Sequence, residues 1–264
     1  MKKRLIISVV SHNHQDVIIK LGTLKDIAEI EDVVVICRDN VPVKKLKDYC
    51  ESLGIIYIAN EKPLGFAENN NRNFKYYLDA LVPQDDEFFL VLNPDVMISK
   101  SEVNKLQKTM VNVSRSCILT IDLFLDKKFT TRDDNIRYYP RFIDFVRTFL
   151  FNSRETMLDR TQVLSKERRV WCSGAFLLMK QSLYRTLGGF NECFFMYCED
   201  IELCYRANKL NVDVEYLSNI RAVHFRHRDS KKFMSKHFFW HVKSVFLYQM
   251  CKLLPQIKRS CILE

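Results

Sequence analysis

The eight residues Phe88–Asp95, FFLVLNPD, join an unbroken apolar run to a short polar segment. Five apolar residues in succession are typical of a strand buried on both faces, since a half-exposed strand would alternate apolar and polar positions. Pro94 has a fixed φ and restricts the residue before it, so Asn93 and Asp95 are expected at a sharp strand exit. The stretch therefore predicts a buried strand over Phe88–Leu92 with polar side chains at its carboxyl end.

On both sides of this strand the sequence alternates apolar strands with amphipathic helices. Further strands are expected over residues 5–10, 33–37, 55–59, 117–125, 175–179, 212–217 and 222–225. Helices are expected over residues 16–30, 43–53, 66–81, 101–113 (with Ser101 as N-cap), 181–187 and 199–210. Such alternation indicates βαβ units, and so an α/β fold whose mainly parallel sheet is covered by helices on both faces.

Composition excludes several classes of protein. The chain has 264 residues, of which 47% are hydrophobic and 28% charged, values typical of a globular protein and not of a disordered chain. The longest apolar run is six residues, Cys193–Cys198, too short to cross a bilayer, and the basic start Met1–Arg4 precedes too few apolar residues for a signal peptide. A cytoplasmic protein with nine reduced cysteines is therefore expected.

Polar residues follow four of the predicted strands. The first strand is followed by Ser11–Asn13, the second by Arg38–Asn40, the third by Asn60 and a Gly65-containing segment, and the fourth by Asn93–Asp95. Ligands of open α/β sheets bind beyond the carboxyl ends of the strands, where these residues should meet. The pattern predicts a binding site there.

Three groups of titratable residues could carry chemistry. Asp95, at a strand exit, could bind a hard divalent cation, and the adjacent Glu199 and Asp200 could supply a general base or simply favour the start of a helix. His224, at the end of a short apolar strand, could be a metal ligand or a structural histidine. The carboxylates of residues 85–87 and 133–134 lie in polar loops and are expected to be solvated.

The C-terminal part carries most of the positive charge. The net charge is +9, and residues 219–264 contain ten basic and two acidic residues. Within them an amphipathic helix is predicted, whose apolar stripe consists of Phe239, Val242, Phe246, Met250 and Leu253. That stripe could pack on the protein's own core or lie on an anionic membrane surface.

Taken together, these motifs resemble those of inverting family-2 glycosyltransferases of the GT-A fold, particularly bacterial O-antigen rhamnosyltransferases. The resemblance covers about residues 5–227, and its most specific segment is Gly188–Arg206. The other segments that carry it are Val10–Asn13, Arg38–Asn40, Asn60, Gly65–Asn71, Leu92–Asp95 and Trp171–Ala175. It implies a GT-A domain over residues 1–228 and a basic helical extension over 229–264.

The resemblance also implies roles for individual residues. Asp200 would be the catalytic base, with Glu199 as the second candidate, and Asp95 with His224 would hold Mg²⁺ or Mn²⁺. Asn93 stands where many relatives have the first aspartate of a D-x-D motif, which removes one negative charge from the metal site. The nucleotide-sugar pocket would be lined by Ser11, Asn13, Asp39 (on the pyrimidine ring), Asn60, Gly65, Asn70, Asn93, Trp171 and Gly174.

The implied reaction is transfer of L-rhamnose from dTDP-L-rhamnose, with inversion, to a polyprenyl-diphosphate-linked sugar during O-antigen (lipopolysaccharide) synthesis. It would take place at the inner face of the cytoplasmic membrane, with the C-terminal helix on the anionic surface. Alternatives are a galactofuranosyl- or hexosyltransferase of the same fold, a nucleotidyltransferase, and a nucleic-acid-binding protein. The sequence has neither the Gly-rich basic loop expected of the second nor a nucleic-acid-binding motif.

Overall fold

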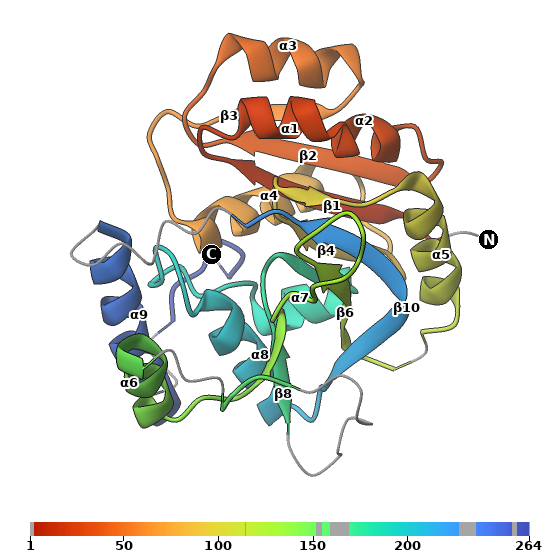
Figure 1. The fold of residues 1–264 in the computed structure, drawn as a ribbon. Helices are drawn as coiled ribbons and strands as arrows, with labels where there is room; N and C mark the ends of the chain where they lie inside the picture. The colour runs from red at the N-terminus through yellow and green to blue at the C-terminus, as the bar shows by residue number, and fades with distance from the viewer. Residues whose placement is uncertain are drawn as a thin grey trace.

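A computed structural model of the chain describes residues 3–113, 115–151, 155–158, 169–226, 236–254 and 258–263 (Figure 1). The predicted boundary between residues 228 and 229 lies outside these ranges. Within them the fold is a mixed α/β sheet with helices on both faces, as predicted.

The main sheet of the described residues has eight strands in the order β3-β2-β1-β4-β9-β6-β10-β5. The strands β1 to β4 are mutually parallel, β9 runs antiparallel to β4 and β6, and β10 runs parallel to β6 and antiparallel to β5. Their bounds are β1 Leu5–Ser11, β2 Val33–Asp39, β3 Ile56–Ala59, β4 Phe88–Leu92, β5 Val96–Met97, β6 Ile118–Phe124, β9 Phe176–Lys180 and β10 Val214–His224.

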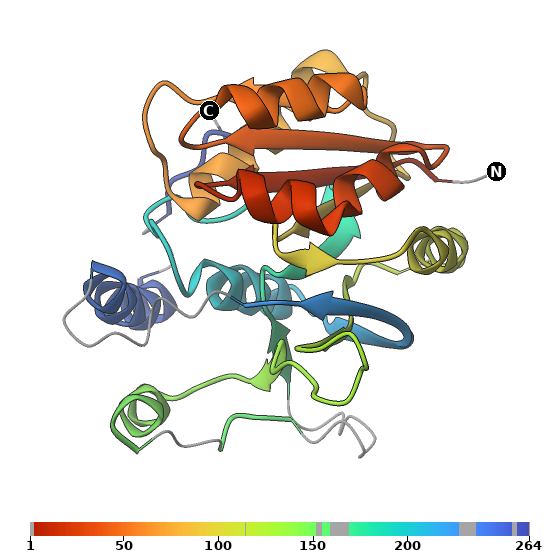
Figure 2. The same cartoon turned by 45° about the horizontal axis from the view of Figure 1, so that its top comes forward.

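Helices cover the two faces of this sheet (Figure 2). One face packs against α1 Gln15–Leu21, α2 Thr23–Ala28, α3 Lys44–Ser52 and α5 Lys100–Val111. The other packs against α4 Phe66–Ala80, α7 Gln181–Leu187, α8 Glu199–Lys209 and α9 Lys236–Leu253. A separate two-stranded ribbon pairs β7 Ile136–Tyr138 with β8 Val170–Cys172. In the chain, α6 Phe142–Phe151 lies between these two strands.

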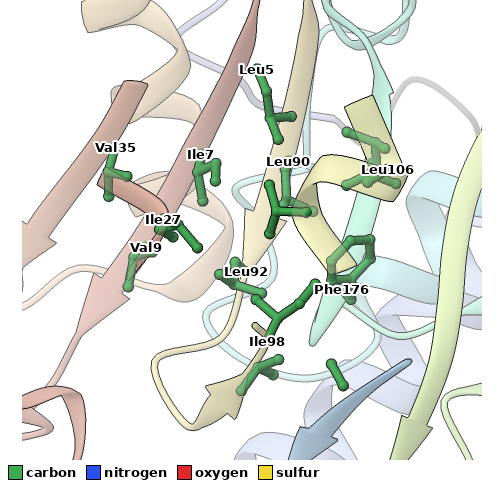
Figure 3. Close-up of a cluster of buried hydrophobic side chains, with 14 of the residues drawn as sticks. Leu5, Ile7, Val9, Ile27, Val35, Leu90, Leu92, Ile98, Leu106 and Phe176 are labelled. Atoms are coloured by element: carbon green, nitrogen blue, oxygen red, sulfur yellow. The ribbon is translucent and has the colours of Figure 1, made fainter. Parts of the chain in front are cut away.

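The alternation of side chains along β1 divides the core between the two faces. Leu5, Ile7 and Val9 point into the cluster beneath α2 and α5, where they meet side chains of β4 such as Leu90 (Figure 3). Ile6 belongs to the cluster beneath α4 and α8. Both clusters are buried because a strand at the centre of a sheet has helices above and below it.

Three details differ from the sequence-based prediction. The helix expected over 16–30 is two helices, because Gly22 has φ +68° and ends the first in the left-handed conformation. Ser99, not Ser101, caps α5, since its hydroxyl accepts a hydrogen bond from the Glu102 amide. The two strands expected over 212–217 and 222–225 form the single strand β10, with a shift of register between Leu217 and Arg221.

The predicted C-terminal helix is present as α9, and its inner face contributes Val245, Tyr248 and Cys251 to the core. The predicted apolar stripe, residues 239, 242, 246, 250 and 253, faces outward instead. Beside it lies α6, whose Phe142 ring is 5.6 Å from that of Phe246 (Figure 1). No helix in the described ranges is long and apolar enough to span a membrane.

Candidate functional site

A cavity of about 470 Å³ opens at the carboxyl ends of β1 and β4. The antiparallel strand β9 brings the segment before it, residues 173–175, to the same edge, and the end of β10 arrives beside β5. The beginnings of α8 and α9 complete the walls. The sheet topology thus gathers residues that are up to 230 positions apart in the sequence, from Val10 to Trp240.

Asp95 and His224 form one end of the cavity. The Asn93 amide donates to the Ala175 carbonyl at 3.0 Å, and the Phe225 amide donates to the Asp95 carbonyl at 3.1 Å, so backbone bonds fix both strand ends. As a result, His224 Nε2 lies 3.4 Å from Asp95 Oδ1. Both residues are buried, with 6% of Asp95 and 8% of His224 exposed, and both line the cavity.

The charges of this pair support each other. Burial opposes the charged form of His224, but hydrogen bonds to Asp133 and Asp95 outweigh it and raise the His224 pKa to about 9. Burial likewise opposes the charged form of Asp95, yet its hydrogen bond and charge interaction with His224 lower the Asp95 pKa. Asp95 is therefore a carboxylate and, without a cation, His224 is an imidazolium at neutral pH.

The pair fits a divalent cation. Two ligands about 2.1 Å from one ion, on adjacent octahedral positions, lie about 3 Å apart, close to the observed separation. Within the described residues no group of three or more His, Cys, Asp and Glu side chains is arranged to hold a metal. A cation at Asp95 and His224 would therefore need oxygens from a ligand such as a diphosphate, which is how Mg²⁺ is commonly bound.

Glu199 and Asp200 lie at the start of α8 and line the same cavity. Asp200 accepts hydrogen bonds from the amides of Gly174 at 3.1 Å and Ile201 at 2.8 Å, which orient its carboxylate. The two residues before the pair, Tyr197 and Cys198, have φ of +73° and +64°. Non-glycine residues adopt this conformation at a cost and concentrate at functional sites, so the turn that presents the pair is a strained one.

The environments of the two acids differ. Burial and the charge of Asp200 raise the Glu199 pKa well above its ordinary value, and Glu199 Oε2 has no hydrogen-bond partner among the described residues. Burial also raises the Asp200 pKa, but three backbone hydrogen bonds and Arg137 oppose the rise. Glu199 therefore takes up a proton more readily than an ordinary glutamate, while the backbone amides and Arg137 favour the charged form of Asp200.

A buried amide network lies beneath the β1–β2 side of the cavity. Asn60 donates to Asn40 at 2.9 Å and to Asn69 at 2.6 Å, and accepts from Arg38 at 2.9 Å. Asn40 in turn donates to the Leu64 carbonyl. Asn40 and Asn69 reach the cavity wall, so the network holds the wall rigid from behind.

Two buried oxygen atoms at the ends of β1 and β2 lack partners among the described residues. They are Ser11 Oγ and Asp39 Oδ1, on residues that pair across the two strands. The other oxygen of Asp39 accepts from the Val43 amide and the Tyr57 hydroxyl, both at 3.0 Å. Buried polar atoms are normally hydrogen-bonded, so this position suits a ligand that supplies donors.

The structure brings part of the predicted site together. The predicted residues that line the cavity are Asn93, Asp95, Gly174, Glu199, Asp200 and His224. Those that lie outside its wall are Ser11, Asn13, Asp39, Asn60, Gly65, Asn70 and Trp171.

The residues outside the wall have other contacts. Asn70 accepts from Ser8 within the core at 2.7 Å, and the Trp171 indole donates to the Tyr138 carbonyl at 3.2 Å. Asn13 is exposed, and His12 and His14 face the cavity in its place. A Cβ on Gly65 would lie 2.6 Å from the Phe195 carbonyl oxygen, so this glycine permits a close approach between two backbone segments.

Two loop carboxylates that were predicted to be solvated are buried, and for them the prediction was wrong. Glu87 pairs with Arg4 at 2.5 Å, and Asp133 contacts both His224 and Arg226. Each carboxylate is compensated by cationic side chains. These cationic residues lie far from the carboxylates in the sequence, so the polarity of the neighbouring residues did not reveal that the carboxylates are buried.

An aromatic wall at the beginning of α9 is the second feature that the sequence did not reveal. Trp240 and His237 line the cavity; the Trp240 ring is 4.8 Å from that of Phe195, and His237 Nδ1 is 2.9 Å from the Tyr197 hydroxyl. The helical periodicity predicted that both residues lie on one helix, but it did not predict which face of that helix each of them occupies. Thus α9 is part of the cavity wall as well as of the core.

Comparisons with known proteins agree with this architecture. The chain is 35% identical over 244 residues to the rhamnosyltransferase WbbL of Escherichia coli, covering 92% of this chain and 91% of that protein. It is 25% identical over 183 residues to an N-acetylglucosaminyl-diphospho-decaprenol L-rhamnosyltransferase of Mycobacterium tuberculosis, covering 64% of this chain and 57% of that one. No family model matches the sequence.

Among solved structures, a mannosyltransferase from Pyrobaculum calidifontis, in complex with GDP-Man and Mn²⁺, superposes with a TM-score of 0.58 at 11% identity. The match covers 95% of this chain and 65% of that one, and it supports the GT-A fold. With the extensive similarity to WbbL, it confirms the family expected from the sequence. The chain belongs to the family-2 glycosyltransferases of the GT-A fold, as a relative of the O-antigen rhamnosyltransferases.

Proposed function

We propose that this chain transfers L-rhamnose from dTDP-L-rhamnose, with inversion and with a divalent cation, to a polyprenyl-diphosphate-linked sugar in cell-surface polysaccharide synthesis. The observation that carries the proposal is that the Asp95–His224 pair and the oriented Asp200 carboxylate face one cavity. The names of the two curated relatives support the sugar, and that of the mycobacterial protein supports the class of acceptor.

In this proposal, the two ends of the cavity have different tasks. Asp95 and His224 would hold Mg²⁺ or Mn²⁺, and the bound ion would offset the negative charge of the diphosphate leaving group. Arg226 also lines the cavity and adds positive charge at the same end. The unpaired Asp39 oxygen suits the ring N–H of the pyrimidine, since that group can donate the missing hydrogen bond.

The transfer is a single displacement. Asp200 takes the proton of the acceptor hydroxyl while the oxygen of that hydroxyl forms a bond to the anomeric carbon. The bond from that carbon to the diphosphate oxygen breaks, and the nucleoside diphosphate leaves with the electron pair. Attack opposite the leaving group inverts the anomeric configuration. The aromatic wall of Trp240 and Phe195 offers an apolar surface against which a sugar ring of the acceptor can pack.

A donor screen tests the proposal. Purified protein with Mn²⁺ and a polyprenyl-diphospho-N-acetylglucosamine acceptor is expected to release nucleoside diphosphate from dTDP-L-rhamnose at least tenfold faster than from UDP- or GDP-sugars. Each reaction without acceptor is the control for simple hydrolysis. Preference for a UDP-hexose or UDP-galactofuranose would favour the alternative transferases, and release from none of the donors would contradict the proposal.

The location we propose is the inner face of the cytoplasmic membrane, with the outward face of α9 on the lipid. Phe239, Phe246 and Leu253 are 53%, 55% and 80% exposed, and α6 adds exposed Phe142 beside Phe246. Exposed apolar side chains of this size, gathered on one surface, are typical of an interaction site. The basic side chains of α9, Lys236, Lys243 and Lys252, suit an anionic surface.

Substitution on the outward face tests this location better than removal of the helix, because removal would also take Tyr248 and Val245 out of the core. The double variant Phe239→Ser, Phe246→Ser is expected to bind phosphatidylglycerol vesicles roughly 10- to 100-fold more weakly, since two buried aromatic groups are lost. Val111→Ser, at an exposed position of the distant α5, is the control and should bind normally. Unchanged sedimentation of the double variant with the vesicles would refute the membrane contact.

A further inference from the structure

The loop that joins β6 to β7 places a buried carboxylate behind the proposed metal site. Asp133 is 1% exposed, and its amide donates to the Leu123 carbonyl at 2.8 Å. The Leu125 amide donates to the Thr131 carbonyl at 2.8 Å, so both sides of the loop are tied to the end of β6. Because β6 pairs in parallel with β10, the loop holds Asp133 beside the end of β10, where His224 lies.

The two nitrogens of His224 have different partners. Nδ1 is 2.6 Å from Asp133 Oδ2, while Nε2, on the other side of the ring, is 3.4 Å from Asp95 Oδ1. A carboxylate at Nδ1 holds a proton there, which leaves Nε2 as the nitrogen with a lone pair when the ring is neutral. Histidines that bind metals commonly have such a carboxylate or carbonyl behind them, which fixes the tautomer and the orientation of the ring.

The second oxygen of Asp133 pairs with Arg226, which also lines the cavity. The Asp133 carboxylate thus contacts two side chains from the end of β10 and the residues just after it. These are His224, the last residue of β10, and Arg226, two residues further along the chain. The motifs single out His224 but neither Asp133 nor Arg226. Both side chains line the cavity, and His224 lies beside Asp95.

We propose that Asp133 is the positioning residue of the cation site: it fixes His224 with Nε2 toward the cation. The inference rests on the proposed metal-dependent transfer. In this inference Asp133 acts through His224. Loss of the Asp133 carboxylate should therefore weaken binding of the cation and leave the proposed base Asp200 in place. An ordinary buried ion pair would contribute to folding stability alone.

The test is the affinity for Mn²⁺ in the presence of dTDP, measured by electron paramagnetic resonance of free Mn²⁺. Asp133→Asn is expected to weaken Mn²⁺ binding about 10- to 100-fold, the usual effect of removing a residue that supports a metal ligand. The control is Asp122→Asn, since Asp122 is equally buried and pairs with Arg132 of the same loop at 3.3 Å. This control should lose thermal stability to a similar degree but retain the Mn²⁺ affinity of the unmodified protein.

A double variant shows whether Asp133 acts through the histidine. If it does, Asp133→Asn combined with His224→Ala should bind Mn²⁺ no more weakly than His224→Ala alone, because the two losses are not additive. Additive losses, equal losses in Asp133→Asn and Asp122→Asn, or no Mn²⁺ binding by the unmodified protein would overturn the inference. Normal Mn²⁺ binding without transfer of rhamnose would overturn the proposed function and leave the positioning role intact.

Discussion

Replacement of Asp200 by Asn is expected to lower kcat about 10²- to 10⁴-fold, the range that a general base contributes, while the affinity for dTDP and Mn²⁺ stays within a few-fold. The amide has nearly the shape of the carboxylate but cannot take the proton of the acceptor hydroxyl. The measurement is kcat with saturating donor and acceptor, together with titration of dTDP. Such a split between turnover and binding identifies a group that acts on the acceptor and not on the nucleotide.

Glu199→Gln is the matched control for this variant. Because the raised pKa of Glu199 favours its neutral form, an uncharged amide should preserve most of its interactions, and kcat should fall less than tenfold. The raised pKa of Asp200 also predicts that kcat declines on acidification at a higher pH than for an ordinary aspartate, since protonation would remove the proposed base. If Glu199→Gln abolished turnover and Asp200→Asn did not, the base would be Glu199.

Replacement of Asp95 by Ala is expected to have the second large effect. It removes one of the two proposed protein ligands of the cation, so the affinity for Mn²⁺ in the presence of dTDP should fall by at least about 100-fold. The His224 pKa should fall as well, because one of its two carboxylate partners is lost. Calorimetric titration of dTDP with and without Mn²⁺ separates the binding that depends on the cation from that which does not.

The control for Asp95→Ala is Asp86→Ala, in the exposed loop before β4. It removes a carboxylate of the same type from the same region of the chain and should leave the binding of dTDP and Mn²⁺ unchanged. If Asp95→Ala bound dTDP with Mn²⁺ as tightly as the unmodified protein, Asp95 would not be a cation ligand. The Asp95–His224 pair would then be a structural ion pair at a strand end.

The sequence predicted the parts of the fold that depend on local patterns. The strand over Phe88–Leu92 and the helix over Gln181–Leu187 have the expected bounds, because an apolar run with a polar exit and a helical period are local signals. The interruption at Gly22 was missed because the periodic pattern continues across it, and only the backbone conformation of the glycine ends the helix.

The site was predictable where it depends on strand ends and unpredictable where it depends on packing. Asn93 and Asp95 follow a strand whose end must reach the ligand edge of the sheet, and they do line the cavity. Asp133 carried no such signal, since its burial depends on cations more than 90 residues away. The faces of α9 were likewise ambiguous, because both the stripe at Phe246 and the opposite side at Tyr248 are apolar, and only the tertiary structure selects between them.

The most direct test of this arrangement of the site is a crystal structure of the protein with dTDP-L-rhamnose and Mn²⁺. We expect one Mn²⁺ bonded to Asp95, His224 Nε2 and diphosphate oxygens, with the thymine ring beside Asp39. We also expect the Asp200 carboxylate on the side of the anomeric carbon opposite the diphosphate. A nucleotide whose diphosphate lies outside this cavity, or a cation that contacts neither Asp95 nor His224, would contradict this arrangement.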